Sequence, residues 1–136
     1  MKKEEYVIYK EKKYYVSNFL IDLHRSGEAP KKFKFLNLRR MSINDIDEIE
    51  GLENLIDLEI LDLQENNISE IKGLENLINL KRLNIGNQVS EIKGLENLTQ
   101  LTHLGLTNSI SEIKGLENLV KLEYLTLGHQ ITEIKN

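Results

Sequence analysis

The sequence predicts a solenoid of stacked short repeats that follows a different N-terminal segment. Three observations lead to this prediction. The pentapeptide Gly-Leu-Glu-Asn-Leu begins at residues 51, 73, 94 and 115, with spacings of 22, 21 and 21 residues. An alternating stretch of leucine or isoleucine follows each copy, and these two residue types together make up 39 of the 136 residues. Several aligned copies at one period indicate a single structural unit repeated along the chain.

Each repeat combines a strand pattern with a turn pattern. Leu61 and Leu63 have the period of two that directs alternate side chains to one side of a strand. Leu74, Leu77 and Leu80 have the spacing of three that aligns side chains along a 3₁₀-like turn. Glycine opens this turn, where we expect a side chain to obstruct it. The roughly seven apolar residues of one repeat cannot bury themselves alone, so neighbouring repeats must stack.

The complete motif identifies a family resemblance. An isoleucine lies two residues before each pentapeptide glycine, and the following stretch reads Leu58-x-x-Leu61-x-Leu63 in the first copy. An incomplete copy, Phe33-x-x-Leu36-x-Leu38, precedes the others. Residues 33–136 resemble the leucine-rich repeat family, in the short-repeat subclass typified by phosphatase regulators and bacterial internalins. The resemblance implies an α/β fold: a right-handed solenoid with a curved parallel β-sheet on the concave face and 3₁₀ or short-helical turns on the convex face.

The family also places an asparagine after the strand, where its side chain satisfies backbone groups at the bend. Asn66, five residues after Leu61, fits this position. In the shorter copies Asn87 and Asn108 come one residue early, and His129 takes that place in the last copy. Either the turn is tightened by one residue, or other polar residues substitute, namely Gln88, Ser109 and Gln130. We therefore predict an irregular asparagine ladder.

Residues 1–32 are predicted to form an N-terminal cap, and residues 33–136 an array of about five repeats, the first of them irregular. The segments 6–9 and 14–16 are rich in β-formers, which predicts a hairpin, although the turn between them lacks glycine and asparagine. Ser17 is the predicted N-cap of a short amphipathic helix over residues 18–25, which ends before Gly27. Hairpin and helix together are expected to cover the apolar stacking face of the first repeat.

The C-terminal end of the array has no comparable cap, since the sequence stops in mid-motif at residues 131–136. We expect Leu122, Leu125 and Leu127 to line an open edge. Three interpretations remain open: a fragment of a longer array, an oligomer joined edge to edge, or a tolerated open end. The second makes the chain a structural or regulatory part that assembles through this edge.

The two parts of the chain differ in charge. Residues 1–40 carry eleven Lys or Arg against five Asp or Glu, whereas residues 41–136 carry seven against seventeen. Much of the acidity belongs to the repeat unit and aids solubility. Basic residues cluster without intervening acids only at Lys31, Lys32, Lys34, Arg39 and Arg40. Such a cluster could bind nucleic acid, but an acidic protein or the chain's own acidic repeats is the favoured of these alternatives.

The residues between the strand leucines form the candidate site, because the resemblance places them on the concave face, where the family binds its partners. They differ between copies while the framework is nearly identical, which fits a binding surface and also fits solvated positions under no selection. We interpret them as a surface for a protein partner, since one column mixes the aromatic, arginine and apolar types that dominate interface hot spots. The candidate residues are Phe35, Asn37, Arg39, Ile60, Asp62, Gln64, Arg82, Asn84, His103, Thr107, Tyr124, Thr126 and His129.

Composition argues against several other functions. The absence of cysteine excludes a disulfide framework, a thiolate metal site and a cysteine nucleophile. No apolar run approaches the roughly 18 residues of a membrane span, and no signal-peptide core follows Met1, so we expect a cytoplasmic protein. No carboxylate is placed to complete a triad or metal site with His24, His103 or His129. Because no glycine-rich phosphate loop is present either, we expect neither enzymatic activity nor a cofactor.

Overall fold

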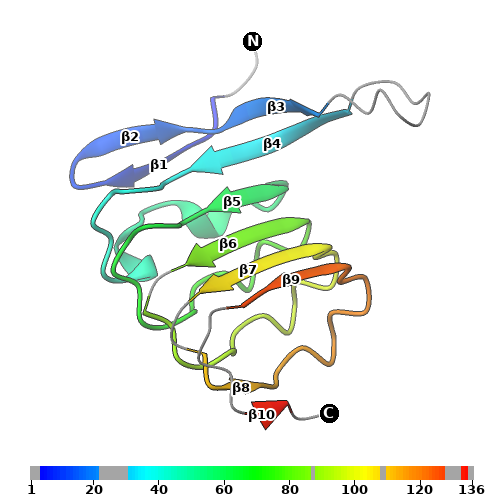
Figure 1. Cartoon of the computed structure of the whole chain (residues 1–136). Helices are drawn as coiled ribbons and strands as arrows, with labels where there is room; N and C mark the ends of the chain where they lie inside the picture. Colours follow the sequence, from blue (N-terminus) through cyan, green and yellow to red (C-terminus); the bar gives the residue numbers. More distant parts are fainter. Residues whose placement is uncertain (1–3, 22–30, 87, 108–109, 128–132, 135–136) are drawn as a thin grey trace.

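A parallel β-sheet organises the chain. The computed structural model describes residues 4–21, 31–86, 88–107, 110–127 and 133–134 (Figure 1). The main sheet has the strand order β3-β4-β5-β6-β7-β9. Its strands are β3 (Ser17–Ile21), β4 (Lys31–Asn37), β5 (Ile60–Asp62), β6 (Arg82–Gly86), β7 (His103–Thr107) and β9 (Tyr124–Thr126). Strands β4, β5, β6, β7 and β9 are parallel, each contributed by one repeat, which confirms the predicted solenoid.

The repeats are stacked in register, so equivalent leucines meet across neighbouring strands. Leu36 pairs with Leu61, Leu61 with Leu83, and Leu83 with Leu104. All four are buried, with at most 2% of the residue surface exposed. The leucines of the repeat therefore form one continuous core along the array, as the periodicity predicts.

Short turns line the convex face opposite the sheet. Two of them are 3₁₀ helices, η1 (Ile46–Glu48) and η2 (Leu52–Asn54). In the next repeat the Leu77 N–H donates to the Leu74 carbonyl and the Leu80 N–H to the Leu77 carbonyl, both at 3.0 Å, so the leucines spaced by three share the inward side. Gly94 opens the equivalent turn with φ +73°, and a Cβ there would lie 2.8 Å from the Ile71 carbonyl oxygen. The expected obstruction at this glycine is thus confirmed.

The predicted N-terminal hairpin is present. Strands β1 (Tyr6–Tyr9) and β2 (Lys12–Tyr15) pair antiparallel around a two-residue turn. Lys10 and Glu11 form this turn with φ of +46° and +64°, the left-handed conformation that hairpins of this length require. The hairpin joins the first repeat through two hydrogen bonds between the backbones of Ile8 and Glu50, of 2.9 and 2.8 Å.

The predicted helix over residues 18–25 is wrong where the structure describes it. Residues 18–21 belong to β3, which pairs antiparallel with β4 in the register Ser17↔Phe35 to Ile21↔Lys31; residues 22–25 lie outside the described residues. The physical reason is that β4 would otherwise present an unpaired edge, and satisfying its backbone groups outweighs local helical patterning. The predicted boundary at residue 32 falls inside β4, so the division into cap and array stays a prediction.

Asn66 bridges two repeats, as predicted for the asparagine ladder. Its buried Oδ1 accepts from the N–H groups of Met41 and Ile43, at 2.9 and 3.0 Å. Its Nδ2 donates to the carbonyls of Leu38 and Leu63, both at 2.8 Å. The side chain of Gln88 is exposed, unlike that of Asn66. The other expected ladder positions, Asn87, Asn108, Ser109, His129 and Gln130, lie outside the described residues.

A second short parallel pair, β8 (Glu112–Ile113) and β10 (Glu133–Ile134), lies at the C-terminal end of the array (Figure 1). Within the described ranges there is no helix long and apolar enough to cross a membrane.

Candidate functional site

The parallel register aligns candidate residues from successive repeats on the concave face of the main sheet, the face directed away from the leucine core. Consecutive pairs are Phe35↔Ile60, Ile60↔Arg82, Arg82↔His103 and His103↔Tyr124. We call these five residues the central column. A second column lies on the same face, two residues further along each strand. It contains Asn37, Asp62, Asn84, Gly105 and Thr126. Residues 21 to 25 positions apart in the sequence thus become neighbours.

A shallow pocket of about 180 Å³ lies at the centre of this face. It is lined by Phe35, Ile60, Asp62, Arg82 and Asn84. Ile60 forms an almost buried apolar floor with 7% exposure, while Phe35, Arg82 and Asn84 are half-buried. The pocket therefore combines an apolar base with a cationic and a polar wall.

An aromatic pair lies beyond Arg82 in the same column. The rings of His103 and Tyr124 are stacked, with centroids 4.4 Å apart and planes inclined by 21°. Thr102 Oγ1 lies 2.8 Å from His103 Nδ1, within hydrogen-bond distance of the edge of the ring. Burial, and then the nearby positive charge of Arg82, lower the pKa of His103, against a smaller opposite effect of Glu123. The lowered pKa favours the neutral imidazole of His103, and Tyr124 presents an aromatic surface that is 59% exposed.

The second column is fixed by hydrogen bonds to the backbone. Asp62 Oδ1 accepts from the Gln64 N–H at 3.0 Å, and Asn37 Oδ1 from the Arg39 N–H at 3.1 Å. Burial raises the pKa of Asp62, despite the favourable hydrogen bond from Gln64. These contacts form tight Asx turns that end the strands in a defined shape.

Gly105 makes room for its neighbour in the second column. A Cβ at this glycine would lie 2.5 Å from Asn84 Oδ1, so the Asn84 side chain extends over Gly105. Of the remaining candidates, Gln64 is half-buried and Thr126 is exposed. Thr107 lies in β7 opposite Gly86, but its side chain and the whole of His129 are outside the described part of the chain.

The basic cluster predicted around residues 31–40 is largely neutralised by ion pairs. Arg39 and Arg40 both pair with Glu65, and these two arginines, Arg40 first, lower the pKa of the Glu65 carboxyl. Lys34 Nζ lies 3.0 Å from Glu5 Oε2. Lys32 is exposed, and the side chain of Lys31 is outside the described residues.

The sequence prediction missed a second asparagine ladder, on the convex face. The pentapeptide asparagines Asn76, Asn97 and Asn118 each donate through Nδ2 to the carbonyl of the pentapeptide glutamate in the preceding repeat, over 3.4, 3.3 and 3.3 Å. The sequence could have indicated this ladder, because all four copies of the pentapeptide contain this asparagine although it faces solvent. Its role is to join neighbouring turns.

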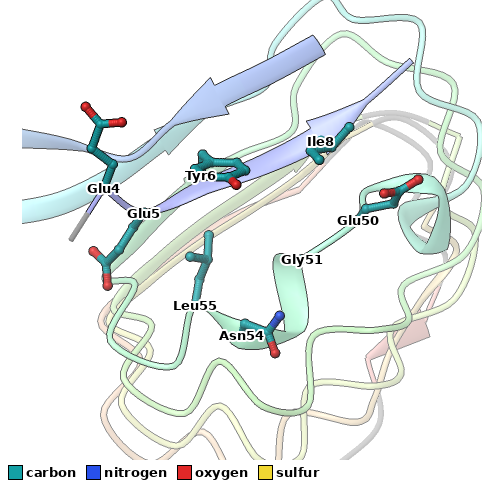
Figure 2. A pocket seen from close by; sticks show the side chains of 8 residues that line it. All are labelled: Glu4, Glu5, Tyr6, Ile8, Glu50, Gly51, Asn54 and Leu55. Atoms are coloured by element: carbon teal, nitrogen blue, oxygen red, sulfur yellow. The ribbon is translucent and has the colours of Figure 1, made fainter. Parts of the chain in front are cut away.

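A larger pocket, of about 440 Å³, lies where the hairpin meets the first convex turn. Figure 2 shows its lining, with Tyr6 and Ile8 on β1 and with Asn54 and Leu55 on the turn, where Leu55 points toward Tyr6. Glu4, Glu5, Glu50 and Gly51 complete it. The pocket lies at this junction because the turn that contains Asn54 stacks against the hairpin and not against the turn of another repeat. Local sequence patterns do not encode such a junction. Within the described ranges, no group of three or more acidic or histidine side chains could hold a metal ion.

Comparison with known proteins agrees with the repeat architecture. The family described as Leucine Rich repeats (2 copies) matches residues 56–97. The crystal structure of internalin C2 from Listeria monocytogenes is similar, with 21% sequence identity and a TM-score of 0.47. The similarity covers 75% of this chain and 54% of the internalin chain, so this chain spans about half the length of that structure. No curated protein sequence matches significantly. Residues 56–97 thus match the leucine-rich repeat family, and the pentapeptide and the in-register parallel strands continue the same repeat on both sides of this segment.

Proposed function

We propose that this protein is a non-enzymatic interaction module that binds a protein partner on its concave face. The observation that supports this most is the central column. Its five side chains differ from repeat to repeat, whereas the leucines beside them are the same in every repeat. Arginine and tyrosine at the centre of an interface commonly contribute much of its binding energy. Because the sheet positions them in advance, little conformational entropy is lost when a partner binds.

Affinity capture from native lysate, read out by mass spectrometry, tests this proposal. The wild-type chain is compared with Arg82→Ala/Tyr124→Ala, which truncates the two hot-spot candidates of the column. The control is Val120→Ala/Lys121→Ala, which truncates two exposed side chains of a convex turn. We expect specific partners with the wild type and the control that are lost with the column variant. Identical sets of captured proteins from all three would refute concave-face binding.

A second candidate function is assembly through the C-terminal edge with another copy of the chain. Leu122, Leu125 and Leu127 are only partly buried, whereas the equivalent residues of the preceding repeat, Leu101, Leu104 and Leu106, are at most 2% exposed. A molecular mass by light scattering that rises with concentration, and that returns to the monomer in Leu122→Lys, would support this assembly. A strictly monomeric mass at high concentration would remove it. The cytoplasmic location stays a prediction from the sequence.

A further inference from the structure

Among the described residues, Arg82 is a charged side chain of the concave face that has no counter-ion. Its neighbours are compensated: Arg39 and Arg40 pair with Glu65, and Lys81 Nζ lies 2.8 Å from Glu59 Oε2. Within the described residues, Arg82 forms neither an ion pair nor a side-chain hydrogen bond. A half-buried guanidinium presents planar donors that match a carboxylate, so this position favours an anionic partner group.

Apolar surfaces flank Arg82 on both sides of the column. Phe35 and Ile60 form the apolar part of the central pocket on one side. The stacked rings of His103 and Tyr124 lie on the other side. Asp62, which also lines the pocket, already accepts from the Gln64 N–H and lies 4.0 Å from Arg39 Nε, so its carboxylate has partners of its own.

The spacing of these features matches an extended peptide laid across the strands. Adjacent strands are about 4.8 Å apart, so Arg82 lies roughly 7 Å from the midpoint of Phe35 and Ile60. The same spacing separates Arg82 from the midpoint of His103 and Tyr124. In an extended chain, residues i and i+2 lie on one side about 6.7 Å apart. Three alternate residues of a peptide can therefore meet the three features at once.

We infer that the partner presents an extended segment whose aspartate or glutamate pairs with Arg82, with apolar or aromatic residues two positions before and after it. This inference rests on the proposed function and names the chemistry of the partner. The apolar residues bury surface on Phe35 and Ile60 at one end and on the aromatic pair at the other. The carboxylate supplies the charge that the column lacks.

Selection from a random dodecapeptide library displayed on phage tests the inference without knowledge of the natural partner. The targets are the wild type, Arg82→Gln and, as a control with the same loss of charge on a convex turn, Lys121→Gln. A selected peptide and its Glu→Gln or Asp→Asn analogue are then titrated by fluorescence anisotropy. We expect wild type and control to enrich an acidic residue with apolar residues at both second neighbours. Affinity for the acidic peptide should fall roughly tenfold or more in Arg82→Gln, while the amide analogue binds both proteins alike.

The outcomes separate the inference from the proposed function. Enriched peptides without the acidic residue, or an acidic preference that persists in Arg82→Gln, would overturn the inference. If these peptides no longer bind Arg82→Ala/Tyr124→Ala, the proposed function would still stand. Peptides that still bind this double variant would count against both. If no peptide is enriched, a linear segment is not the ligand and the inference fails, while capture from lysate still decides the proposed function. Circular dichroism and thermal melting of Arg82→Gln show whether the variant is folded.

Discussion

Replacing Asn66 by alanine tests the idea that one buried amide joins the first two strands of the array. The side chain makes four hydrogen bonds of 2.8 to 3.0 Å to backbone groups, two as acceptor and two as donor. A buried hydrogen bond contributes about 1 kcal/mol net, and a buried group left unpaired costs about 1–3 kcal/mol. Asn66→Ala should therefore lower the free energy of unfolding by about 4 kcal/mol. This is a large share of the stability expected for a domain of this size.

Urea unfolding followed by far-ultraviolet circular dichroism measures this loss. The control is Asn67→Ala, the same substitution at the adjacent, exposed asparagine. It should change the free energy of unfolding by less than about 0.5 kcal/mol. A loss below about 1 kcal/mol for Asn66→Ala, or equal losses for the two variants, would refute the bridging role. It would also remove the physical basis for an asparagine at this position of the repeat.

Three further predictions concern the hairpin turn and the concave face. Lys10→Asn/Glu11→Gly should raise the free energy of unfolding by about 1 kcal/mol, because both residues have positive φ; an unchanged or lower urea midpoint would contradict the assigned turn. Asp62→Asn should stabilise the fold at pH 7, because burial raises the pKa of Asp62 in the folded state and the ionised carboxyl thus opposes folding. This gain should disappear as the pH falls to about 3, where the carboxyl is largely protonated in both states. A gain that does not depend on pH in urea titrations would argue against the burial effect. Arg82→Gln should raise the pKa of His103 in an NMR titration, although burial remains the main cause of its lowered value; an unchanged pKa would show that the two side chains are not electrostatically coupled.

The repeat architecture was predictable from sequence because its signal is copied several times. Period and spacing alone indicated strands, turns and stacking, and the parallel register then placed Phe35 opposite Ile60 and Arg82 opposite His103. The position of each column residue followed from that of the leucine beside it. The hairpin was also predictable, since β-formers outline it even though its turn residues are unfavourable.

Features that depend on contacts between distant segments were not predictable in the same way. Residues 18–21 have a helical pattern, but they pair with β4 because its edge needs partners. The basic cluster looked like a free cationic surface, since nothing local shows that Arg39 and Arg40 meet Glu65, about 25 positions later. Identifying Arg82 as a concave-face charge without a counter-ion in the described part of the chain required knowledge of all these pairs.

Side chains of the central column can be exchanged for new binding properties without disturbing the leucine core. At Gly105, beside this column, a substitution affects both the packing and the binding surface. Exchanging Arg82 or Tyr124 leaves the inward leucines unchanged, so such variants should alter binding with little loss of stability. Gly105 differs, because any side chain there must displace the Asn84 amide. Asn84 in turn lines the pocket that contains Ile60 and Arg82. A substitution at Gly105 should therefore change the shape of the pocket from the neighbouring strand, without touching any residue of the central column.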